Sequence, residues 1–256
     1  MTRIISVHSF RGGTGKSNTS ANIAALLAAS GQRVGVIDTD VQSPGIHVLF
    51  GFSENIEGRT LNDYLYGSCS ILDAAHDVTS IVASSPRGMD DGGALFLVPS
   101  SIKAGDIAKV LRQGYDVEML NEGFRSLLKG LELDCLLIDT HPGLNEETLL
   151  SITISDTLLL ILRPDNQDYQ GTAVTVDIAR RLEVPELLLL VNKVPSNVDV
   201  AALEGEVSGA YRCPVAGVLP LSEDIVVNAS SQLFAAQQPE HEWSQILAGV
   251  AARLSS

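Results

Sequence analysis

A glycine-rich segment close to the start of the chain holds the residues with the clearest chemical potential. The segment reads FRGGTGKS over residues 10–17 and directly follows a run of apolar residues. Its glycines allow consecutive backbone N–H groups to point at one centre, and a helix beginning there adds its positive end. Lys16 supplies a cation, and the hydroxyl of Ser17 is placed to bind Mg²⁺. The segment therefore predicts a loop that holds a polyphosphate.

Carboxylates follow two other apolar runs. Asp38 and Asp40 come at the end of one run, and Asp139 ends another. In open α/β sheets, ligands bind beyond the carboxyl ends of the strands, so we expect these carboxylates near the phosphate loop. The alternative is that strand-end aspartates simply cap the turns that follow them.

The elements that must position these residues alternate along the chain. Short apolar or β-branched runs, which predict strands, are separated by longer stretches with apolar residues at helical spacing. The predicted strands are residues 3–8, 33–38, 94–98, 135–139, 156–162, 186–191 and 215–219. The predicted helices are residues 16–30, 61–75, 116–131, 172–182, 200–211 and 241–254. This alternation predicts an α/β fold with a mostly parallel twisted sheet and helices on both faces, in one domain over residues 1–256.

Composition narrows the class of protein. The chain has 256 residues, 45% hydrophobic, and a net charge of -14, which disfavours a free-standing nucleic-acid binder. Cys69, Cys135 and Cys213 are widely spaced and form no C-x-x-C pair, so neither a disulfide framework nor a zinc site is indicated. No apolar run approaches the ~18 residues of a bilayer-spanning helix, and the first residues lack a secretory signal. We expect a soluble, cytoplasmic protein.

The phosphate loop resembles the deviant Walker A loop of the ParA/MinD family of P-loop ATPases, whose usual form is K-G-G-x-G-K-[ST]. Phe10 stands where ordinary phosphate loops have glycine, and Arg11 stands at the family's signature lysine. The resemblance implies that ATP is sandwiched in a homodimer and that Arg11 reaches the phosphates bound by the partner subunit. Arginine keeps the charge but differs in geometry from lysine. The alternative is that Arg11 pairs with a carboxylate of its own chain.

The carboxylate segments resemble the same family. In its D-x-D-x-Q segment, the second aspartate, here Asp40, belongs to switch I and places the attacking water, while Asp38 supports Mg²⁺ through water. Asp139 corresponds to the Walker B aspartate, which contacts Mg²⁺ through water, and the turn at 140–143 corresponds to switch II. We interpret His141 as a turn residue, because phosphoryl transfer relies chiefly on positioning and charge stabilisation.

The base is predicted from residues 187–195, LLLLVNKVP. Pro195 replaces the aspartate of the N-K-x-D motif that reads guanine, so adenine is the predicted base, hydrogen-bonded by Asn192 and closed over by the turn at 217–221. The predicted cofactors are ATP and Mg²⁺. The predicted nucleotide-binding residues are Gly12, Gly13, Thr14, Gly15, Lys16, Ser17, Asn18, Asn192 and Pro220. The predicted metal ligands are Ser17, Asp38, Asp40 and Asp139, and the predicted catalytic residues are Lys16, Asp40 and Arg11.

The resemblance implies a Mg²⁺-dependent, slow and partner-stimulated ATPase that acts as a dimerisation switch. Such proteins position plasmids, chromosomes, division proteins or protein compartments, with a stimulating partner or cargo adaptor. The final residues carry one arginine, Arg253, so no membrane anchor is seen. Weak, non-specific DNA binding is an alternative means of attachment. Its sparse candidate residues are Arg180, Arg181, Lys193, Arg212 and Arg253.

Three other functions are alternatives. A metal-cluster carrier or reductase built on the same loop would need cysteines that meet at a dimer axis, and the three cysteines have no near partner in the sequence. A small-molecule kinase or ligase would need its own substrate pocket. A relative that binds ATP without cleaving it would be distinguished by comparing the ATPase of the parent with that of Asp40→Ala.

Overall fold

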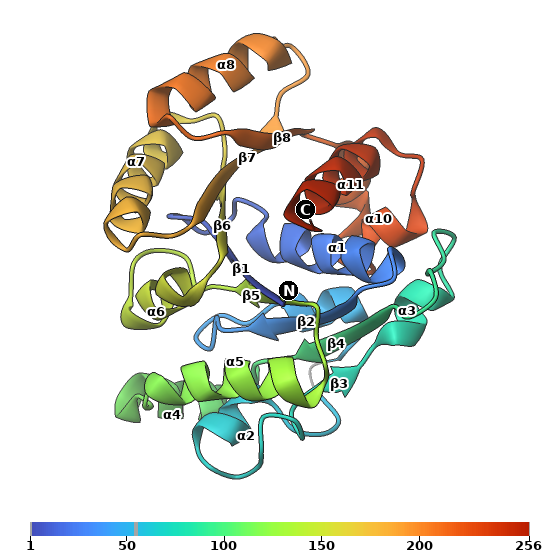
Figure 1. Cartoon of the computed structure of the whole chain (residues 1–256), viewed down its shortest axis with the longest axis vertical. Helices are drawn as coiled ribbons and strands as arrows, with labels where there is room; N and C mark the ends of the chain where they lie inside the picture. Colours follow the sequence, from blue (N-terminus) through green and yellow to red (C-terminus); the bar gives the residue numbers. More distant parts are fainter. Residues whose placement is uncertain (1, 54–55, 256) are drawn as a thin grey trace.

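Leucine-rich and β-branched runs form the strands of one twisted sheet (Figure 1). The computed structural model describes residues 2–53 and 56–255. Within those residues the sheet has eight strands, and their order is β3-β4-β2-β5-β1-β6-β7-β8. The strands are β1 (Arg3–His8), β2 (Arg33–Asp38), β3 (His76–Asp77), β4 (Ala94–Val98), β5 (Cys135–Asp139), β6 (Thr157–Leu162), β7 (Glu186–Val194) and β8 (Val215–Pro220).

All neighbouring strands of this sheet pair in parallel except β3, which pairs antiparallel with β4 at one edge. A parallel sheet requires crossover connections, and helices supply them on both faces. The helices are α1 (Lys16–Ala29), α2 (Leu61–Leu65), α3 (Thr79–Ala83), α4 (Ala104–Gln113), α5 (Glu118–Gly130), α6 (Glu146–Ile154), α7 (Asn166–Arg181), α8 (Val200–Tyr211), α9 (Glu223–Asn228), α10 (Phe234–Gln237) and α11 (Glu242–Ser255). A 3₁₀ helix, Ile46–Phe50, follows β2.

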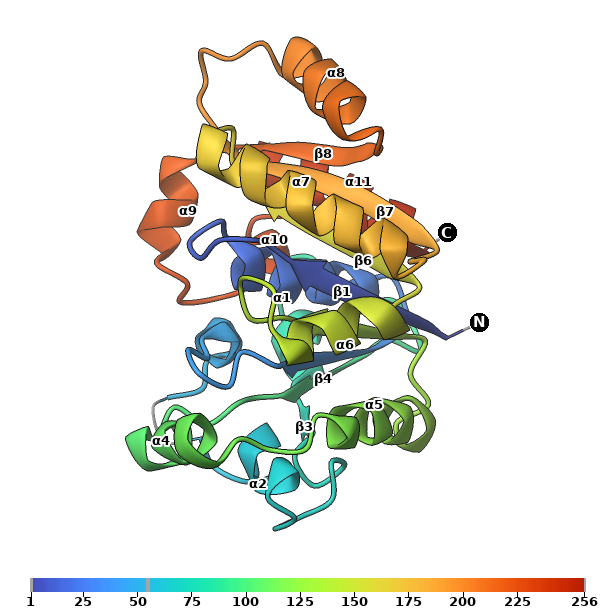
Figure 2. The same cartoon turned by 90° about the vertical axis from the view of Figure 1, so that its left-hand side faces the viewer.

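The apolar core consists of three clusters, one on the face of the sheet that α1 covers and two on the opposite face. The first cluster packs α1, α10 and α11 against alternate residues of most strands, including Ile5 and Val7 of β1. The second packs α7 and α8 against β6 and β7, and the third packs α2, α4 and α5 against β2 and β5. Figure 2 shows α5, α6 and α7 lying on the face opposite α1. The α/β fold predicted from the alternation of elements is confirmed.

The strand predictions agree with the structure closely, and the helix predictions agree less well. The predicted helix over 61–75 is wrong beyond Leu65, because the chain turns at Gly67, whose φ of +70° is unfavourable for other residues. The helix predicted over 172–182 begins earlier, at Asn166, because Asp165 caps it by accepting hydrogen bonds from the N–H groups of Gln167 and Asp168. The assignment of residues 1–256 to one domain stays a prediction.

Candidate nucleotide-binding site

Strand order brings the predicted site residues together at the carboxyl ends of neighbouring strands. β5 lies between β1 and β2, and within the register Val7 pairs with Asp139 and Asp38 pairs with Asp139. The loop that follows β1 is the phosphate loop, so it emerges beside Asp139. Residues more than a hundred positions apart in the chain therefore meet where parallel sheets bind their ligands.

The phosphate loop encloses a cavity of about 340 Å³. Residues 12–18 line it, together with Asp40 and Ser43 from the segment after β2 and Pro142 from the segment after β5. Gly13 and Gly15 have φ of +78° and +95°, in the left-handed region that favours glycine. A Cβ at Gly15 would also lie 2.5 Å from the Nδ2 atom of Asn192. Glycine at position 15 is therefore required by backbone conformation and by packing.

Lys16 forms a buried ion pair inside the site. Its Nζ atom lies 3.1 Å from Oδ1 of Asp139, and the two side chains are 7% and 1% exposed. The hydroxyl of Ser20 donates a second hydrogen bond to the same oxygen at 2.8 Å. The other carboxylate oxygen of Asp139, Oδ2, is buried and has no hydrogen-bond partner among the described residues. Asp139 thus offers a free acceptor beside the phosphate loop.

The two aspartates after β2 differ in how they are held. Asp38 is fully buried, and its oxygens accept hydrogen bonds from the N–H groups of Asp40 and Gly45 at 3.0 and 3.3 Å. Burial, reinforced by the nearby charge of Asp139, raises the pKa of Asp38 to about 8. Asp40 reaches the cavity itself, and burial raises its pKa as well. Asp38 therefore fixes the backbone of the segment that carries Asp40.

His141 links the two predicted switch segments. Its Nδ1 donates to the carbonyl oxygen of Pro142 at 2.6 Å, and its Nε2 lies 3.7 Å from Oδ1 of Asp40. The sequence interpretation treated His141 only as a turn residue and missed this contact. The signal was hidden because the two segments are a hundred residues apart and meet only through the pairing of β2 with β5.

A second cavity, of about 290 Å³, adjoins the first and shares Gly15 and Asn18 with it. Its walls are largely apolar and include Pro220 and Trp243, with Asn192 at the end nearest the loop. An apolar slot with a few polar groups suits a purine base. The phosphate and apolar cavities adjoin each other, as the phosphates and the base of one nucleotide do.

Asn192 and Lys193 both hold the phosphate loop. Nδ2 of Asn192 donates to the carbonyl oxygen of Thr14 at 2.8 Å, and Nζ of Lys193 donates to the carbonyl oxygen of Gly13 at the same distance. The sequence makes Lys193 a candidate basic residue for DNA, and its contact with the loop appears only in the structure. The adenine contact expected of Asn192 stays a prediction.

Arg11 lies apart from the phosphate cavity, although it belongs to the same loop. The residues that line the cavity do not include it. Its Nη1 atom instead donates to Oε1 of Gln167 and lies 3.8 Å from Oδ1 of Asp168, both at the start of α7. The structure of one chain therefore shows the pairing with a local carboxylate that was the alternative interpretation of this residue.

The donor set of the site fits a nucleotide with Mg²⁺. The unpartnered Oδ2 of Asp139 and the hydroxyl of Thr14, which is also buried without a partner among the described residues, are polar atoms that such a ligand would satisfy. No group of three or more His, Cys, Asp or Glu in residues 2–53 and 56–255 could form a cage for a metal ion by itself. Mg²⁺ commonly binds one or two protein groups and completes its shell with water and phosphate oxygens.

The other residues singled out in the sequence lie elsewhere. Cys135 belongs to the first core cluster and Cys213 to the second, whereas Cys69 packs against the third. Arg180 donates to the carbonyl oxygens of Tyr211 and Arg212, and so is engaged at the end of α8. No helix in the described part of the chain is long and apolar enough to cross a bilayer.

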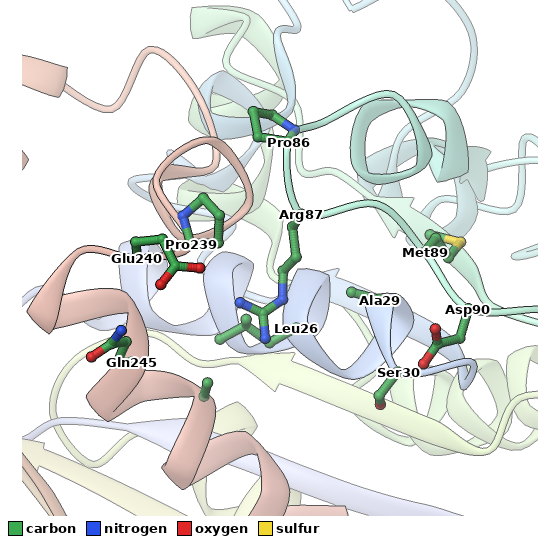
Figure 3. Close-up of a pocket in the computed structure, with 11 residues that line it drawn as sticks. Leu26, Ala29, Ser30, Pro86, Arg87, Met89, Asp90, Pro239, Glu240 and Gln245 are labelled. Atoms are coloured by element: carbon green, nitrogen blue, oxygen red, sulfur yellow. The ribbon is translucent and has the colours of Figure 1, made fainter.

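A larger cavity, of about 600 Å³, lies away from the phosphate loop. It is bounded by the second half of α1, the 86–90 segment and the start of α11 (Figure 3). Arg87 extends across it toward Leu26, with Glu240 and Asp90 on either side. None of the predicted nucleotide residues lines this cavity, so size alone does not identify the site in this fold.

Three features define a P-loop nucleotide-binding protein. They are a phosphate loop at the carboxyl end of a strand in a parallel sheet, the Lys16–Asp139 ion pair and an adjoining apolar cavity for the base. A family model described as an AAA domain matches residues 2–184, which is more than half of the chain. The chain belongs to this family, the ParA/MinD-type P-loop ATPases, as the resemblance of its loop predicted.

Relatives that are similar in sequence carry different names. An uncharacterized ATP-binding protein of Methanocaldococcus jannaschii is 28% identical over 222 residues, which are 86% of this chain and 75% of that protein. An iron-sulfur cluster carrier protein of Methanococcus maripaludis is 27% identical over 191 residues, 73% of this chain and 59% of that protein. The chain thus spans between 59% and 75% of the length of these two relatives.

Solved structures share the whole fold. The septum site-determining protein MinD of Pyrococcus horikoshii, complexed with Mg-ADP, superposes with a TM-score of 0.78 at 21% identity and covers 99% of this chain and 96% of its own. MinD in the MinC:MinD complex of Aquifex aeolicus gives a TM-score of 0.77 at 18% identity, with coverage of 99% and 95%. At these identities, the likeness establishes the fold.

Proposed function

We propose that this chain is a slow Mg²⁺-dependent ATP hydrolase whose ATP-bound form pairs two copies and thereby switches attachment to an intracellular cargo. The observation that carries the proposal is that the two cations of the phosphate loop lie in different places. Lys16 lies in the phosphate cavity beside Asp139, whereas Arg11 lies outside that cavity and is 40% exposed. An exposed cation that belongs to the phosphate loop but does not line its own cavity supports a contact with a second subunit, once it leaves its partners on α7.

In this proposal each cavity residue has a distinct role. The N–H groups of residues 12–18 hold the phosphates, and Lys16 contributes the charge that binds them. The predicted metal ligands, Ser17, Asp38, Asp40 and Asp139, would hold Mg²⁺, which when bound neutralises phosphate charge. Asp40, which lines the cavity, orients the attacking water. Pro220 and Asn192 border the space for the adenine.

The proposed cellular role is to position or partition a cargo, which is a plasmid, a chromosome, a division component or a protein compartment. Family membership and the fold of MinD support this class, and the MinC:MinD complex shows that a protein of this fold assembles with a partner. We therefore propose that a partner or cargo adaptor stimulates hydrolysis by this chain. A cytoplasmic location is part of the same proposal, and weak DNA binding is one means of attachment that the trapped ATP form tests.

A metal-cluster carrier is the second candidate, because relatives named iron-sulfur cluster carriers align with most of this chain. The cysteines argue for the switch instead, because the three thiols lie against three separate apolar clusters. Iron analysis of protein purified without oxygen distinguishes the two. Stoichiometric iron with bound sulfide would favour the carrier, and its absence is expected for the switch.

The decisive experiment traps the ATP form. Asp40→Ala removes the residue assigned to the attacking water, so ATP should persist and the protein should double in mass by light scattering with ATP and Mg²⁺ but not with ADP. A strictly monomeric trapped form would contradict the dimer switch. Retention on DNA or liposomes that is equal with ATP and ADP would contradict nucleotide control of attachment. Calorimetry with ATP and GTP tests the base, and ATP is expected to bind more tightly.

A further inference from the structure

Phe10, which replaces the glycine of ordinary phosphate loops, and Arg11, which replaces the family's signature lysine, contact the same helix. Phe10 packs on α7, where a Cβ added at Gly171 would lie 2.1 Å from the Phe10 Cδ1 atom. Arg11 contacts Gln167 and Asp168, one turn earlier on α7. Positions 167, 168 and 171 share one face of a helix, because residues three and four apart are neighbours there. The first turns of α7 therefore form the surface on which Phe10 and Arg11 of the loop pack.

On this surface of α7, Asp168 already accepts hydrogen bonds from another residue. Arg163, at the end of β6, donates to both of its carboxylate oxygens at 2.9 and 3.2 Å, and the Arg163 N–H donates at 3.0 Å. Arg11 adds a more distant charge, at 3.8 Å. Gln167 accepts the one direct hydrogen bond from the Arg11 guanidinium to α7 that the described residues contain. Gln167 is accordingly the residue whose contact with Arg11 can change without disturbing the β6–α7 junction.

We propose that Gln167, supported by Asp168, is a positioning residue that holds Arg11 in its own subunit, and that pairing of two ATP-bound subunits requires Arg11 to leave Gln167 for the partner's triphosphate. This inference rests on the proposed dimer function. It adds a competition within each chain that sets how much ATP and protein are needed for pairing.

The physical setting favours such an exchange. Arg11 is 40% exposed and sits at the N-terminal end of α7, where the helix dipole disfavours a cation. Its direct acceptor, Gln167, is neutral. A triphosphate offers several charged oxygens that match the two-pronged guanidinium group, and such charge-assisted pairs are stronger than a bond to an amide. The contact with α7 is thus strong enough to orient Arg11 and weak enough to be replaced.

Two substitutions at one position predict opposite effects. Gln167→Ala removes the acceptor, and Gln167→Glu replaces it with a carboxylate that pairs more tightly with Arg11. The measured quantity is the protein concentration for half-maximal pairing, in the Asp40→Ala background at saturating ATP and Mg²⁺. We expect this concentration to fall roughly three- to tenfold with alanine and to rise by a similar factor with glutamate. These factors correspond to the lower range for a hydrogen bond to a charged group, because the contact is partly exposed. Sedimentation or light scattering measures the concentration.

Two controls isolate the mechanism. In an added Arg11→Ala background, the three residues at position 167 should give equal pairing, since the group they compete for is gone. Without nucleotide, modification of Arg11 by phenylglyoxal, followed by peptide mass spectrometry, should be faster in Gln167→Ala and slower in Gln167→Glu than in the parent.

The outcomes separate this inference from the function on which it rests. If the parent pairs with ATP and both variants match it in pairing and in Arg11 modification, the inference is overturned and the dimer function stands. If glutamate and alanine shift pairing in the same direction, the competition is also overturned. If the trapped parent does not pair at all, both proposals fail.

Discussion

Nζ of Lys16 lies 3.1 Å from Oδ1 of Asp139, so the phosphate-loop lysine and the Walker B aspartate form a buried ion pair. The pair joins residues that are 123 positions apart. It depends on the insertion of β5 beside β1, which places Asp139 in register with Val7. The charge of each partner is therefore part of the folding energetics of the chain as well as of its chemistry.

Replacing Lys16 by alanine should destabilise the protein in the absence of nucleotide. The substitution leaves the Asp139 carboxylate buried without its cation, which typically costs about 3–5 kcal/mol of unfolding free energy. Urea unfolding measures this. Adding Asp139→Asn to Lys16→Ala should recover part of the loss, because the unpaired charge is removed. A Lys16→Ala protein as stable as its parent would show that the pair is not formed in solution.

Gly15 and Gly12 should respond differently to alanine. At Gly15 the φ of +95° and the 2.5 Å approach to Asn192 predict that Gly15→Ala lowers the unfolding free energy by about 1–3 kcal/mol. A Cβ at Gly12 meets nothing within 4 Å, so Gly12→Ala should change stability by less than about 0.5 kcal/mol while it narrows the phosphate cavity and weakens ATP binding. Thermal unfolding and calorimetry on both variants test the contrast, which equal losses of stability would contradict.

Asn192→Ala should weaken binding of phosphate groups as well as binding of the base. The side chain supports the loop through the carbonyl oxygen of Thr14, so its loss should reduce affinity for tripolyphosphate about tenfold, the range for one lost buried hydrogen bond. Calorimetry with tripolyphosphate and with ADP measures the two parts. Any additional loss for ADP reports a contact with adenine. Unchanged tripolyphosphate binding would contradict the role in loop support.

Gly171→Ala should displace Phe10. Its Cβ would overlap the ring, with Cδ1 at 2.1 Å and Cγ at 2.4 Å, so we expect a loss of about 1–3 kcal/mol in unfolding free energy and weaker ATP binding. The double variant with Phe10→Ala provides the control, because a smaller residue at position 10 makes room for the methyl group. Failure of that second change to recover any ATP affinity would disconnect Gly171 from the phosphate loop.

Cys135 should be inert toward alkylation in the folded protein. Burial raises the pKa of its thiol to about 12, so at pH 8 almost none of it is the reactive thiolate. Cys69 is only partly buried and should react with iodoacetamide first, although burial raises its pKa too. Peptide mass spectrometry over time measures the order. Rapid labelling of Cys135 without loss of structure would contradict its burial in the first core cluster.

The sequence predicted much of the fold because strand signals here are local. Buried parallel strands read as nearly continuous apolar runs, and the run over 135–139 matches β5 at both ends. The helices were harder because short amphipathic segments resemble loops. Ala104–Gln113 and Glu146–Ile154 were not predicted, and the start of α7 was missed although Asp165 stands three residues before Asp168 as a recognisable N-cap.

The sequence by itself determined the phosphate loop and the family, because glycine spacing, Lys16 and Ser17 act through local backbone geometry. Tertiary structure decided which distant groups meet that loop. The strand order places Asp139 on Lys16, and the packing of α7 gives Arg11 to Gln167, 156 positions away. Such contacts arise from the sum of packing energies over the whole sheet. No local pattern of residue types encodes these contacts. The partner of Arg11 therefore could not be decided from the amino-acid sequence alone.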